Sequence, residues 1–395
     1  MIYNTNKKNG NKISRLSFGC MRFPKRGGRI DIDAATEMVK TAVGCGINYF
    51  DAAYIYPGIE KALSEALVRT SLRKKVYIAT KLPLMLIKNA GDFDKFFDKQ
   101  KKRLQTDYID YYLMHMLCDL QTWEKLVSLG ILSWIENKKA AGEIINIGFS
   151  YHGGQTEFIK IIDAYNWDFC MIQYNYIDEN NQAGKNGLSY AKEKNIPVFI
   201  MEPLRGSMLA DGLPPKCKTI FATADSSRTP PQWAFRWLWS QEEITSVLSG
   251  MESIEQIKQN SADASEASTE LSEDEKAVYI NVVKEWNKSV KIPCTACGYC
   301  APCPFDADIQ TCFSSYNESY TSGFYRGFRN YFMNTGGIAS KNTGAKNCTG
   351  CRKCEKNCPQ NIKISAEMKK VKKRFEKPLL RLLGKTVKIY FKLKY

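Results

Sequence analysis

The sequence lacks any long apolar run, and it contains only two histidines. The nearest candidate for a membrane span, residues 126–135, is interrupted by Ser128 and Ser133 and falls well short of about 18 apolar residues. The first 18 residues are polar and basic, without the apolar core of a secretory signal. We therefore expect no membrane span and no export signal, and we predict a cytoplasmic protein.

Two phosphate-binding patterns are also missing. The segment after the first predicted strand, residues 22–28, is not the G-x-G-x-x-G of a doubly wound dinucleotide fold, and no Walker-type loop is present. Hydrophobic residues make up 44% and charged residues 25% of the 395 residues, which excludes a wholly disordered or fibrous chain. The length fits one large domain and one small domain.

Short runs rich in β-branched and aromatic residues alternate with amphipathic segments over residues 16–260. Such runs are typical of buried parallel strands, and the segments between them are typical of helices. Eight strand–helix repeats predict a (β/α)8 barrel. The predicted strands are 16–23, 47–53, 76–83, 108–116, 144–150, 169–177, 196–202 and 244–251.

The rest of the chain divides by composition. Residues 260–272 are rich in Ser, Ala and Glu and predict a surface loop, and residues 273–289 predict a helix that closes the barrel domain. We therefore predict a barrel domain over 1–289, a cysteine domain over 290–365 and a basic tail over 366–395. The cysteine domain contains an aromatic-rich stretch, 305–332, that is too apolar for a linker.

Eight of the 14 cysteines fall into two tight groups, which indicates metal ligation rather than a disulfide framework. The second group has the C-x2-C-x2-C-x3-C-P spacing of bacterial [4Fe–4S] ferredoxins, and the first is one residue shorter before its last cysteine. Zinc sites usually use two separated cysteine pairs, so zinc is the weaker alternative. The groups are Cys294, Cys297, Cys300 and Cys303, and Cys348, Cys351, Cys354 and Cys358.

The two cysteine groups are expected to share their ligands. In two-cluster ferredoxins the fourth cysteine of each run binds the other cluster, so Cys358 would join the first three and Cys303 would join the second three. We therefore predict two [4Fe–4S] clusters. Cys312 is the one plausible substitute ligand, and the remaining cysteines are predicted to pack in the interior.

Four ionisable residues lie at or just after the ends of three successive predicted strands: Asp51, Tyr56, Lys81 and His115. Active sites of (β/α)8 barrels lie at the carboxyl ends of the strands. Each residue alone could be a helix cap, a surface aromatic, a solvated end or a core histidine. Together they are much harder to explain as packing residues, and they predict an active site at this end of the barrel.

The sequence resembles the aldo-keto reductase family over roughly residues 10–265. The matching text is FDAAYIYPGIE, IATKLP and DYYLMHM, followed by GFS at 148–150, Gln173 with Tyr174, and MEPLRG at 201–206. The resemblance implies carbonyl reduction with a nicotinamide cofactor. In that family the matching tetrad uses Tyr56 as the general acid, Lys81 and Asp51 as its support, and His115 to orient the carbonyl. With its cysteine domain, the whole chain looks like the iron–sulfur branch of this family.

The same resemblance implies a set of cofactor contacts. Ser150 and Gln173 would hold the nicotinamide amide, Leu204 and Gly206 would lie along the pyrophosphate, and Gly250, Ser253, Gln256 and Asn260 would lie near the adenosine end. Family members that use NADP often carry Lys and Arg where this chain has Gly250 and Gln256, so both NAD and NADP are kept as candidate cofactors. Tyr151 replaces the asparagine that usually follows the strand-5 serine, and His152 is a candidate substrate contact.

The net charge of +16 is concentrated at the C-terminus, where residues 366–395 hold 11 basic and 2 acidic residues. This tail, beside Leu379, Leu380, Leu382 and Leu383, could rest on an anionic membrane surface or dock an acidic ferredoxin or flavodoxin. It carries no nucleic-acid-binding motif, so no nucleic-acid partner is expected. The predicted function is an iron–sulfur oxidoreductase acting on a small carbonyl substrate. The alternative is an electron-transfer protein whose barrel only docks redox partners.

Overall fold

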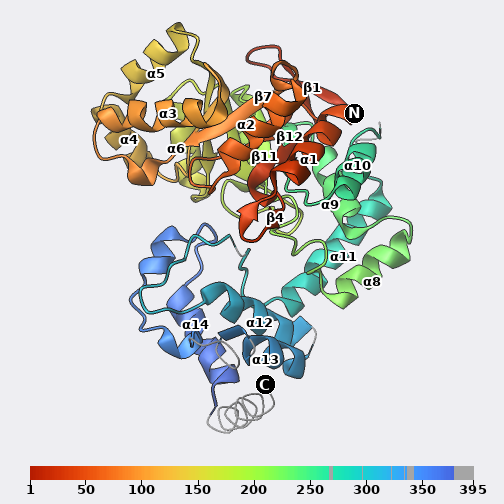
Figure 1. Cartoon of the computed structure of the whole chain (residues 1–395). Helices are drawn as coiled ribbons and strands as arrows, with labels where there is room; N and C mark the ends of the chain where they lie inside the picture. Colours follow the sequence, from red (N-terminus) through yellow and green to blue (C-terminus); the bar gives the residue numbers. More distant parts are fainter. Residues whose placement is uncertain (267–269, 296, 322, 333, 336–341, 378–395) are drawn as a thin grey trace. The chain divides into compact units, whose positions relative to one another are not determined.

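The computed structural model describes the chain except for residues 267–269, 296, 322, 333, 336–341 and 378–395. The described residues form two compact units (Figure 1). The barrel unit comprises Met1–Leu204 and Pro231–Leu271, and the C-terminal unit comprises Arg205–Pro230 and Ser272–Tyr395. Among the described residues, no helix has both the length and the apolar character needed to cross a membrane.

In the described part of the barrel unit, eight parallel strands close into a barrel in the order β10-β11-β12-β3-β6-β7-β8-β9. Each strand lies within or almost within one predicted segment, because strands buried on both faces are read from continuous apolar runs. The predicted (β/α)8 barrel is confirmed. The strands are β3 (Leu16–Gly19), β6 (Tyr49–Asp51), β7 (Tyr77–Leu82), β8 (Ile109–Met114), β9 (Ile144–Tyr151), β10 (Phe169–Gln173), β11 (Val198–Met201) and β12 (Ile244–Ser249).

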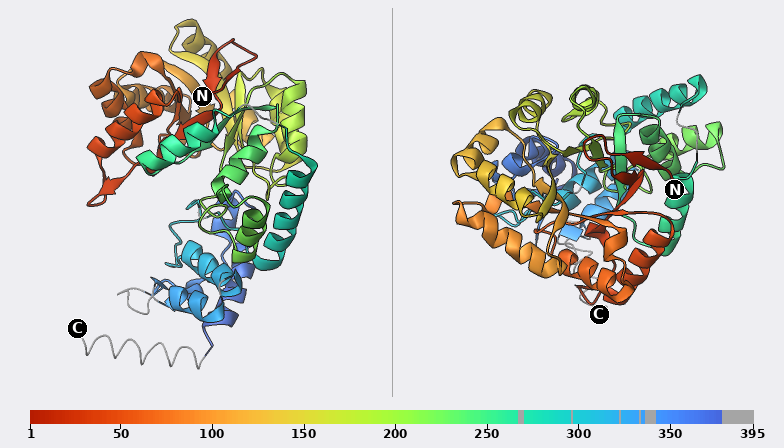
Figure 2. Two further views of the ribbon diagram at one scale, coloured as in Figure 1. Left: turned by 90° about the vertical axis from the view of Figure 1, so that its right-hand side faces the viewer. Right: turned by 90° about the horizontal axis from the view of Figure 1, so that it is seen from above.

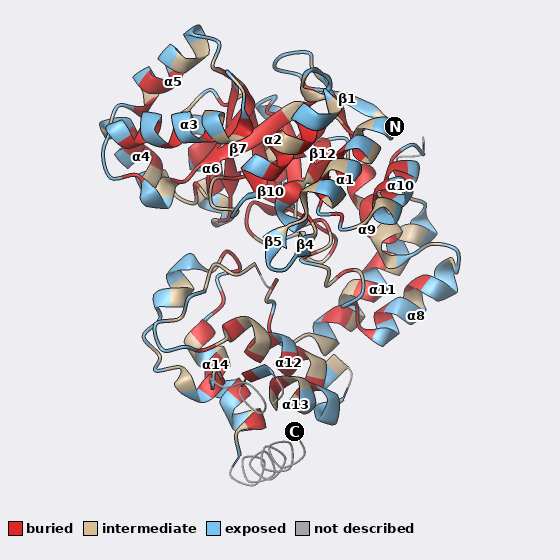
Figure 3. Ribbon diagram, viewed as in Figure 1, coloured by how far each residue is buried: buried red, intermediate tan, exposed pale blue. Residues whose placement is uncertain are grey.

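Helices surround the barrel and turn their apolar faces toward the strands (Figure 2 and Figure 3). The first begins after Asp31, whose side chain caps the helix by accepting a hydrogen bond from the Ala34 amide at 3.1 Å. The helices of this unit are α1 (Ile32–Gly44), α2 (Ile59–Thr70), α3 (Gly91–Leu104), α4 (Leu120–Ser128), α5 (Ile131–Ala140), α6 (Gln155–Ala164), α7 (Gly184–Glu193), α9 (Pro230–Trp239) and α10 (Ile254–Asp263).

A separate set of fully buried side chains from the strands fills the barrel interior. Tyr49, Tyr111, Phe169 and Phe199 contact one another through their rings, with centroids 4.6–5.8 Å apart. Ile13 joins this set from an N-terminal hairpin, β1 (Tyr3–Thr5) and β2 (Lys12–Ser14). A second hairpin, β4 (Lys25–Arg26) and β5 (Arg29–Ile30), precedes α1. The barrel is therefore a packed core, and its chemistry is confined to its rim.

The C-terminal unit is built from helices and from the two cysteine loops. Its helices are α8 (Pro215–Ala224), α11 (Glu273–Ser289), α12 (Ile309–Thr321), α13 (Phe324–Phe332) and α14 (Ile364–Phe375). The aromatic-rich stretch forms α12 and α13, which contribute Phe313, Tyr316 and Tyr331 to its core. This stretch is therefore not a linker.

The units differ from the predicted boundaries in two places. The predicted helix at 273–289 is α11, but it groups with the C-terminal unit, because Tyr279 packs against Phe221 of α8 with ring centroids 6.1 Å apart. The predicted tail begins inside α14, which buries Met368, Val371 and Phe375 in the core of this unit. The start of the tail is thus part of the cysteine domain. The leucines at 379–383 lie outside the described residues.

Candidate active site and cysteine ligand sets

The predicted catalytic residues lie on neighbouring strands at one end of the barrel. Asp51 ends β6, Lys81 is the penultimate residue of β7, and His115 directly follows β8. Strands β6, β7 and β8 are hydrogen-bonded in this order, so their carboxyl ends meet. Tyr56 lies on the loop between β6 and α2, half-buried against the core.

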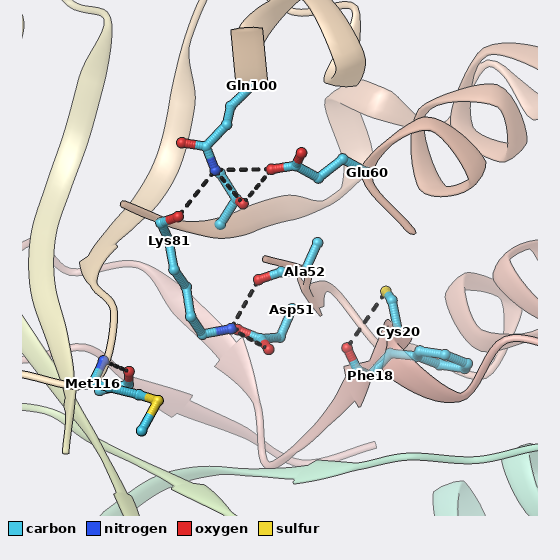
Figure 4. Close-up of polar contacts among 10 residues, drawn as sticks. Phe18, Cys20, Asp51, Ala52, Glu60, Lys81, Gln100 and Met116 are labelled. Atoms are coloured by element: carbon cyan, nitrogen blue, oxygen red, sulfur yellow. Dashed lines mark hydrogen bonds and ion pairs between the residues drawn. The ribbon is translucent and has the colours of Figure 1, made fainter. Parts of the chain in front are cut away.

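Lys81 and Asp51 form a buried ion pair (Figure 4). The Lys81 ammonium lies 2.7 Å and 2.6 Å from the two Asp51 carboxylate oxygens and donates a third hydrogen bond, of 2.8 Å, to the carbonyl of Ala52. Only 3% of the Lys81 side chain and 8% of the Asp51 side chain are exposed. Burial raises the pKa of Asp51, and the neighbouring ammonium opposes that rise. The three bonds fix the position of the Lys81 charge.

Tyr56 and His115 complete the group around that charge. The Lys81 nitrogen lies 5.5 Å from the centroid of the Tyr56 ring, and the rings of Tyr56 and His115 lie edge-to-face with centroids 6.1 Å apart. Burial, Lys81 and His152 together lower the pKa of His115 well below its usual value. Its ring is therefore neutral near pH 7, and its buried Nδ1 has no hydrogen-bond partner among the described residues. The structure brings all four predicted residues together.

A second polar network lies behind the tetrad, and the sequence pattern did not single it out. Buried Glu60 accepts hydrogen bonds from Thr80 at 2.7 Å and from Gln100 at 2.8 Å, and Gln100 also donates to the carbonyl of Lys81 at 3.1 Å (Figure 4). Arg103 bridges Glu60 at 2.8 Å and the carbonyl of Tyr54 at 3.3 Å. The network thus supports both the strand of Lys81 and the loop of Tyr56. Its sequence signal is an acidic residue within the matched FDAAYIYPGIE text.

The predicted nicotinamide residues lie at the ends of β9 and β10. Ser150 is buried, and its hydroxyl oxygen accepts a hydrogen bond from the Met116 amide at 2.9 Å. The amide of Gln173 donates to Asp178 and accepts from Gln182, both at 2.9 Å. The Ser150 hydroxyl can still donate a hydrogen bond, and the Gln173 side chain is an amide with both donor and acceptor atoms. This donor set fits a carboxamide.

His152 is not a solvent-exposed rim residue, because it is only 7% exposed. Burial is the main cause that lowers its pKa to about 4, a hydrogen bond with Gln182 opposes this, and Lys81 lowers it further. Gln182 therefore links the two side chains, because it forms hydrogen bonds with both the His152 imidazole and the Gln173 amide. His152 stays a candidate for contact with the substrate.

The predicted adenosine-end residues lie on the loop after β12 and on α10. The Ser253 hydroxyl caps α10 by accepting from the Gln256 amide at 3.2 Å, and Asn260 donates to Ser249 at 3.3 Å. Arg22 extends to the same loop, where it pairs with Glu252 at 2.6 Å. The aliphatic part of Arg22 lies against Gly250, 3.0 Å from where a Cβ would stand.

The predicted pyrophosphate residues fall in different units. Leu204 packs against the barrel core, whereas Gly206 belongs to the C-terminal unit. Gly206 has a positive φ of 63°, and any Cβ there would collide with the carbonyl oxygen of Thr295. Only glycine therefore fits this position.

The structure brings cysteines of the two sequence groups together, an arrangement compatible with the predicted sharing of ligands. Cys294, Cys297, Cys300 and Cys358 line one pocket, whose other walls include Ile309, Phe313 and Ile362. Burial raises the pKa of Cys300 to about 12, with Cys294 and Cys297 as the next contributors.

The members of the second set influence Cys354 electrostatically. Burial is the main cause that raises its pKa to about 11, and the electrostatic contributors include the thiols of Cys348, Cys303 and Cys351. Within the described residues, no three His, Cys, Asp or Glu converge closely enough to hold a single metal ion. The four thiols that line the first pocket fit a [4Fe–4S] cluster, which is held by four cysteine thiolates. Cys351 is exposed, so this set lies nearer the surface.

Cys312 lies on α12 with no measurable exposure, inside the hydrophobic core of the C-terminal unit. Burial raises its pKa well above the ordinary thiol value. Cys20, Cys170 and Cys217 are likewise buried, whereas Cys45 and Cys118 are half-buried. The proposed ligand sets need none of these residues.

Comparison with known proteins gives two family matches. The model of the aldo/keto reductase family matches residues 15–277, about two thirds of the chain. The model of the 4Fe-4S dicluster domain matches residues 293–363. Both matches confirm the resemblance identified in the sequence.

Similar proteins support the same assignment. An L-galactose dehydrogenase of Arabidopsis thaliana is 26% identical over 290 residues, covering 65% of this chain and 86% of that protein. An NADH-specific methylglyoxal reductase of Escherichia coli K12 is 23% identical over 302 residues, covering 63% and 89%. The structure of an aldo-keto reductase of Bacillus halodurans in its holo form aligns with a TM-score of 0.59 at 21% identity, covering 71% and 96%. An NADPH complex from Klebsiella pneumoniae aligns with a TM-score of 0.56, covering 72% and 96%.

Proposed function

Because the chain belongs to the aldo/keto reductase family, we propose that it reduces a small carbonyl compound, or oxidises the corresponding alcohol, with a nicotinamide cofactor. We further propose that its C-terminal unit binds two [4Fe–4S] clusters that exchange electrons with this reaction. The observation that carries the proposal is the group of Asp51, Tyr56, Lys81 and His115 at the barrel rim.

Each member of this group has a distinct task. Tyr56 donates a proton to the carbonyl oxygen, or removes it from the alcohol in the reverse direction. The ammonium of Lys81 lies near the Tyr56 ring and would stabilise the negative charge left on the phenol oxygen after proton donation. Asp51 and the Ala52 carbonyl hold that ammonium in place. Such proton transfer contributes roughly 10²–10⁴ in rate.

His115 orients the substrate. Its depressed pKa keeps the ring neutral, so it can donate a hydrogen bond to the carbonyl oxygen without competing as an acid. Its unpartnered buried Nδ1 makes the ring able to bond an additional group. The nicotinamide, when bound, supplies or accepts the hydride.

The cofactor would be held by residues at the ends of four strands. Ser150 and Gln173 would bind the nicotinamide amide, and Leu204 and Gly206 would bind the pyrophosphate. Gly250, Ser253, Gln256 and Asn260 would surround the adenosine. Gly250 and Gln256 offer no cation to a 2′-phosphate, whereas Arg22 lies beside Gly250. The proposal therefore covers NADH and NADPH, and the ratio of their KM values measures the preference.

The clusters account for the presence of the second unit. A hydride carries two electrons, and each cluster passes one at a time. Two clusters can thus hold the electrons of one hydride and release them singly to a one-electron acceptor. Exposed lysines on α14, Lys369, Lys370, Lys372 and Lys373, would attract an acidic carrier such as a ferredoxin or flavodoxin.

The test uses the full chain, purified without oxygen. Adding NADH or NADPH, and then a panel of aldehydes and their alcohols, should bleach the cluster absorbance or produce the EPR signal of a reduced cluster. Cys351→Ser should slow transfer to an external acceptor more than it weakens nucleotide binding. Turnover with both clusters oxidised throughout, and unaffected by this substitution, would contradict the coupling.

The alternative function is an electron-transfer protein with a barrel that only docks partners. It is favoured by the unusual adenosine end, where glycine and glutamine stand in place of cations. A fluorescence titration with NADH and NADPH separates the two proposals. Saturable binding that is weakened by Gln173→Ala supports the enzyme, and absence of binding supports the alternative.

A further inference from the structure

A short segment after β11 has an unusual backbone. Arg205, Gly206 and Ser207 have positive φ angles of 49°, 63° and 76°. The left-handed region is costly for residues with side chains, and two of these three carry them. Such a conformation persists only where the surrounding structure holds it, and it often marks a functional segment.

The surroundings that hold this segment are in the C-terminal unit. The Arg205 side chain is among the largest fully buried ones and is 1% exposed. Its guanidinium donates a hydrogen bond of 3.2 Å to the carbonyl of Pro293 and lies 5.6 Å from the ring centroid of Trp286. Gly206 approaches the carbonyl of Thr295 so closely that no Cβ would fit.

Pro293 and Thr295 are the two neighbours of Cys294, the leading cysteine of the first ligand set. The stretch just before them is held from another side by Asn317 of α12. Its side chain accepts from the amides of Lys291 and Ile292, at 3.1 Å and 2.9 Å, and donates to the carbonyl of Ile292 at 2.7 Å. Two side chains, Asn317 and Arg205, therefore hold the backbone around Cys294, and Arg205 is positively charged.

We propose that Arg205 positions the loop of Cys294 and sets the reduction potential of the cluster bound by Cys294, Cys297, Cys300 and Cys358. Reduction adds one electron to the cluster, with no bond made or broken, and increases its negative charge. A fixed guanidinium in a buried setting stabilises that charge more strongly than it would in water. Arg205 thus makes this cluster easier to reduce. This inference rests on the proposed cluster site.

The test is an EPR-monitored redox titration of the full chain with dithionite as reductant. Arg205→Met should shift the midpoint potential of one cluster to a more negative value and leave the other in place. Arg205→Lys, which keeps the charge, should restore most of that shift. Loss of the shifted signal in Cys300→Ser would assign it to the first ligand set. The matched control, Arg326→Met, removes an exposed arginine of the same unit and should move neither potential.

Iron and sulfide analysis precedes every titration and separates two kinds of failure. Wild-type protein without iron would overturn the proposed cluster site itself. Full iron in Arg205→Met with both potentials unchanged would overturn the role of Arg205. If Arg205→Met fails to fold, Arg205→Lys provides the test. A midpoint potential near the wild-type value in Arg205→Lys supports a charge effect. A shifted midpoint potential together with an altered EPR line shape contradicts it.

Discussion

Replacing Lys81 with methionine tests the buried ion pair at the centre of the candidate active site. The substitution removes an ammonium that makes two bonds to Asp51 and one to Ala52, and it leaves a carboxylate whose side chain is 8% exposed. Breaking a buried pair by removing one partner costs about 3–5 kcal/mol. The K81M variant should lose that much stability in the barrel unit and should lose carbonyl reduction.

The double substitution D51N/K81M separates stability from catalysis. It removes both charges, so no charge stays buried without a partner, and the penalty for an uncompensated buried charge disappears. We therefore expect most of the lost stability to return while activity stays absent. Urea unfolding followed by tryptophan fluorescence measures this, since six of the seven tryptophans lie in the barrel unit.

The stability loss of K81M should also depend on pH, in a direction that follows from the pKa of Asp51. Burial already raises the pKa of Asp51, and without Lys81 nothing of equal strength opposes the rise. A carboxyl group whose pKa is higher in the folded state binds protons preferentially there, so stability falls as pH rises from the unfolded value, about 3.9, through the folded pKa. The deficit of K81M should thus shrink on acidification. The reasoning would be refuted if K81M had the same urea unfolding midpoint as the wild type, or if its loss of stability did not change with pH.

Three further predictions follow from the site and the cysteine sets. Tyr56→Phe should abolish carbonyl reduction without changing the iron content or the urea midpoint, and activity within a few-fold of wild type would reject Tyr56 as the acid. Anaerobic protein should contain about eight irons and eight sulfides per chain, whereas four would leave one ligand set without a cluster and stoichiometric zinc would overturn the assignment. Lys372→Glu with Lys373→Glu on α14 should weaken binding to an acidic ferredoxin or flavodoxin at low salt, while Lys74→Glu with Lys75→Glu on the barrel should not. Equal effects of the two pairs would show that only net charge matters.

The barrel could be predicted from the sequence because its strands are buried on both faces. The strand ends could not, because apolar side chains continue where the ladder hydrogen bonds stop. The run predicted over 16–23 is β3 only to Gly19 and then turns at Cys20–Arg22. Between β8 and β9 the chain forms two helices, α4 and α5, because Gly130, with a φ of 89°, interrupts the helical backbone.

The tetrad and the cysteines could be predicted because their residue types and spacings are distinctive. The supporting contacts could not, because they join residues that are far apart in the chain. Gln100 bonds the carbonyl of Lys81 from α3, and Arg205 bonds Pro293 across 88 residues. Helix α14 lies at the start of the segment predicted as a basic tail. Met368, Val371 and Phe375 follow the spacing of a packed helix face in this otherwise basic stretch.

The proposed interleaving of the cysteine sets would constrain the order in which this protein matures. Cys358 lines the same pocket as Cys294, so the proposed first ligand set would be incomplete until 64 more residues have been synthesised. The second set likewise draws Cys303 from the earlier group. We therefore expect cofactor insertion to be a late, post-translational event that completes both sites together. A chain truncated anywhere between the two cysteine groups would therefore have neither ligand set complete.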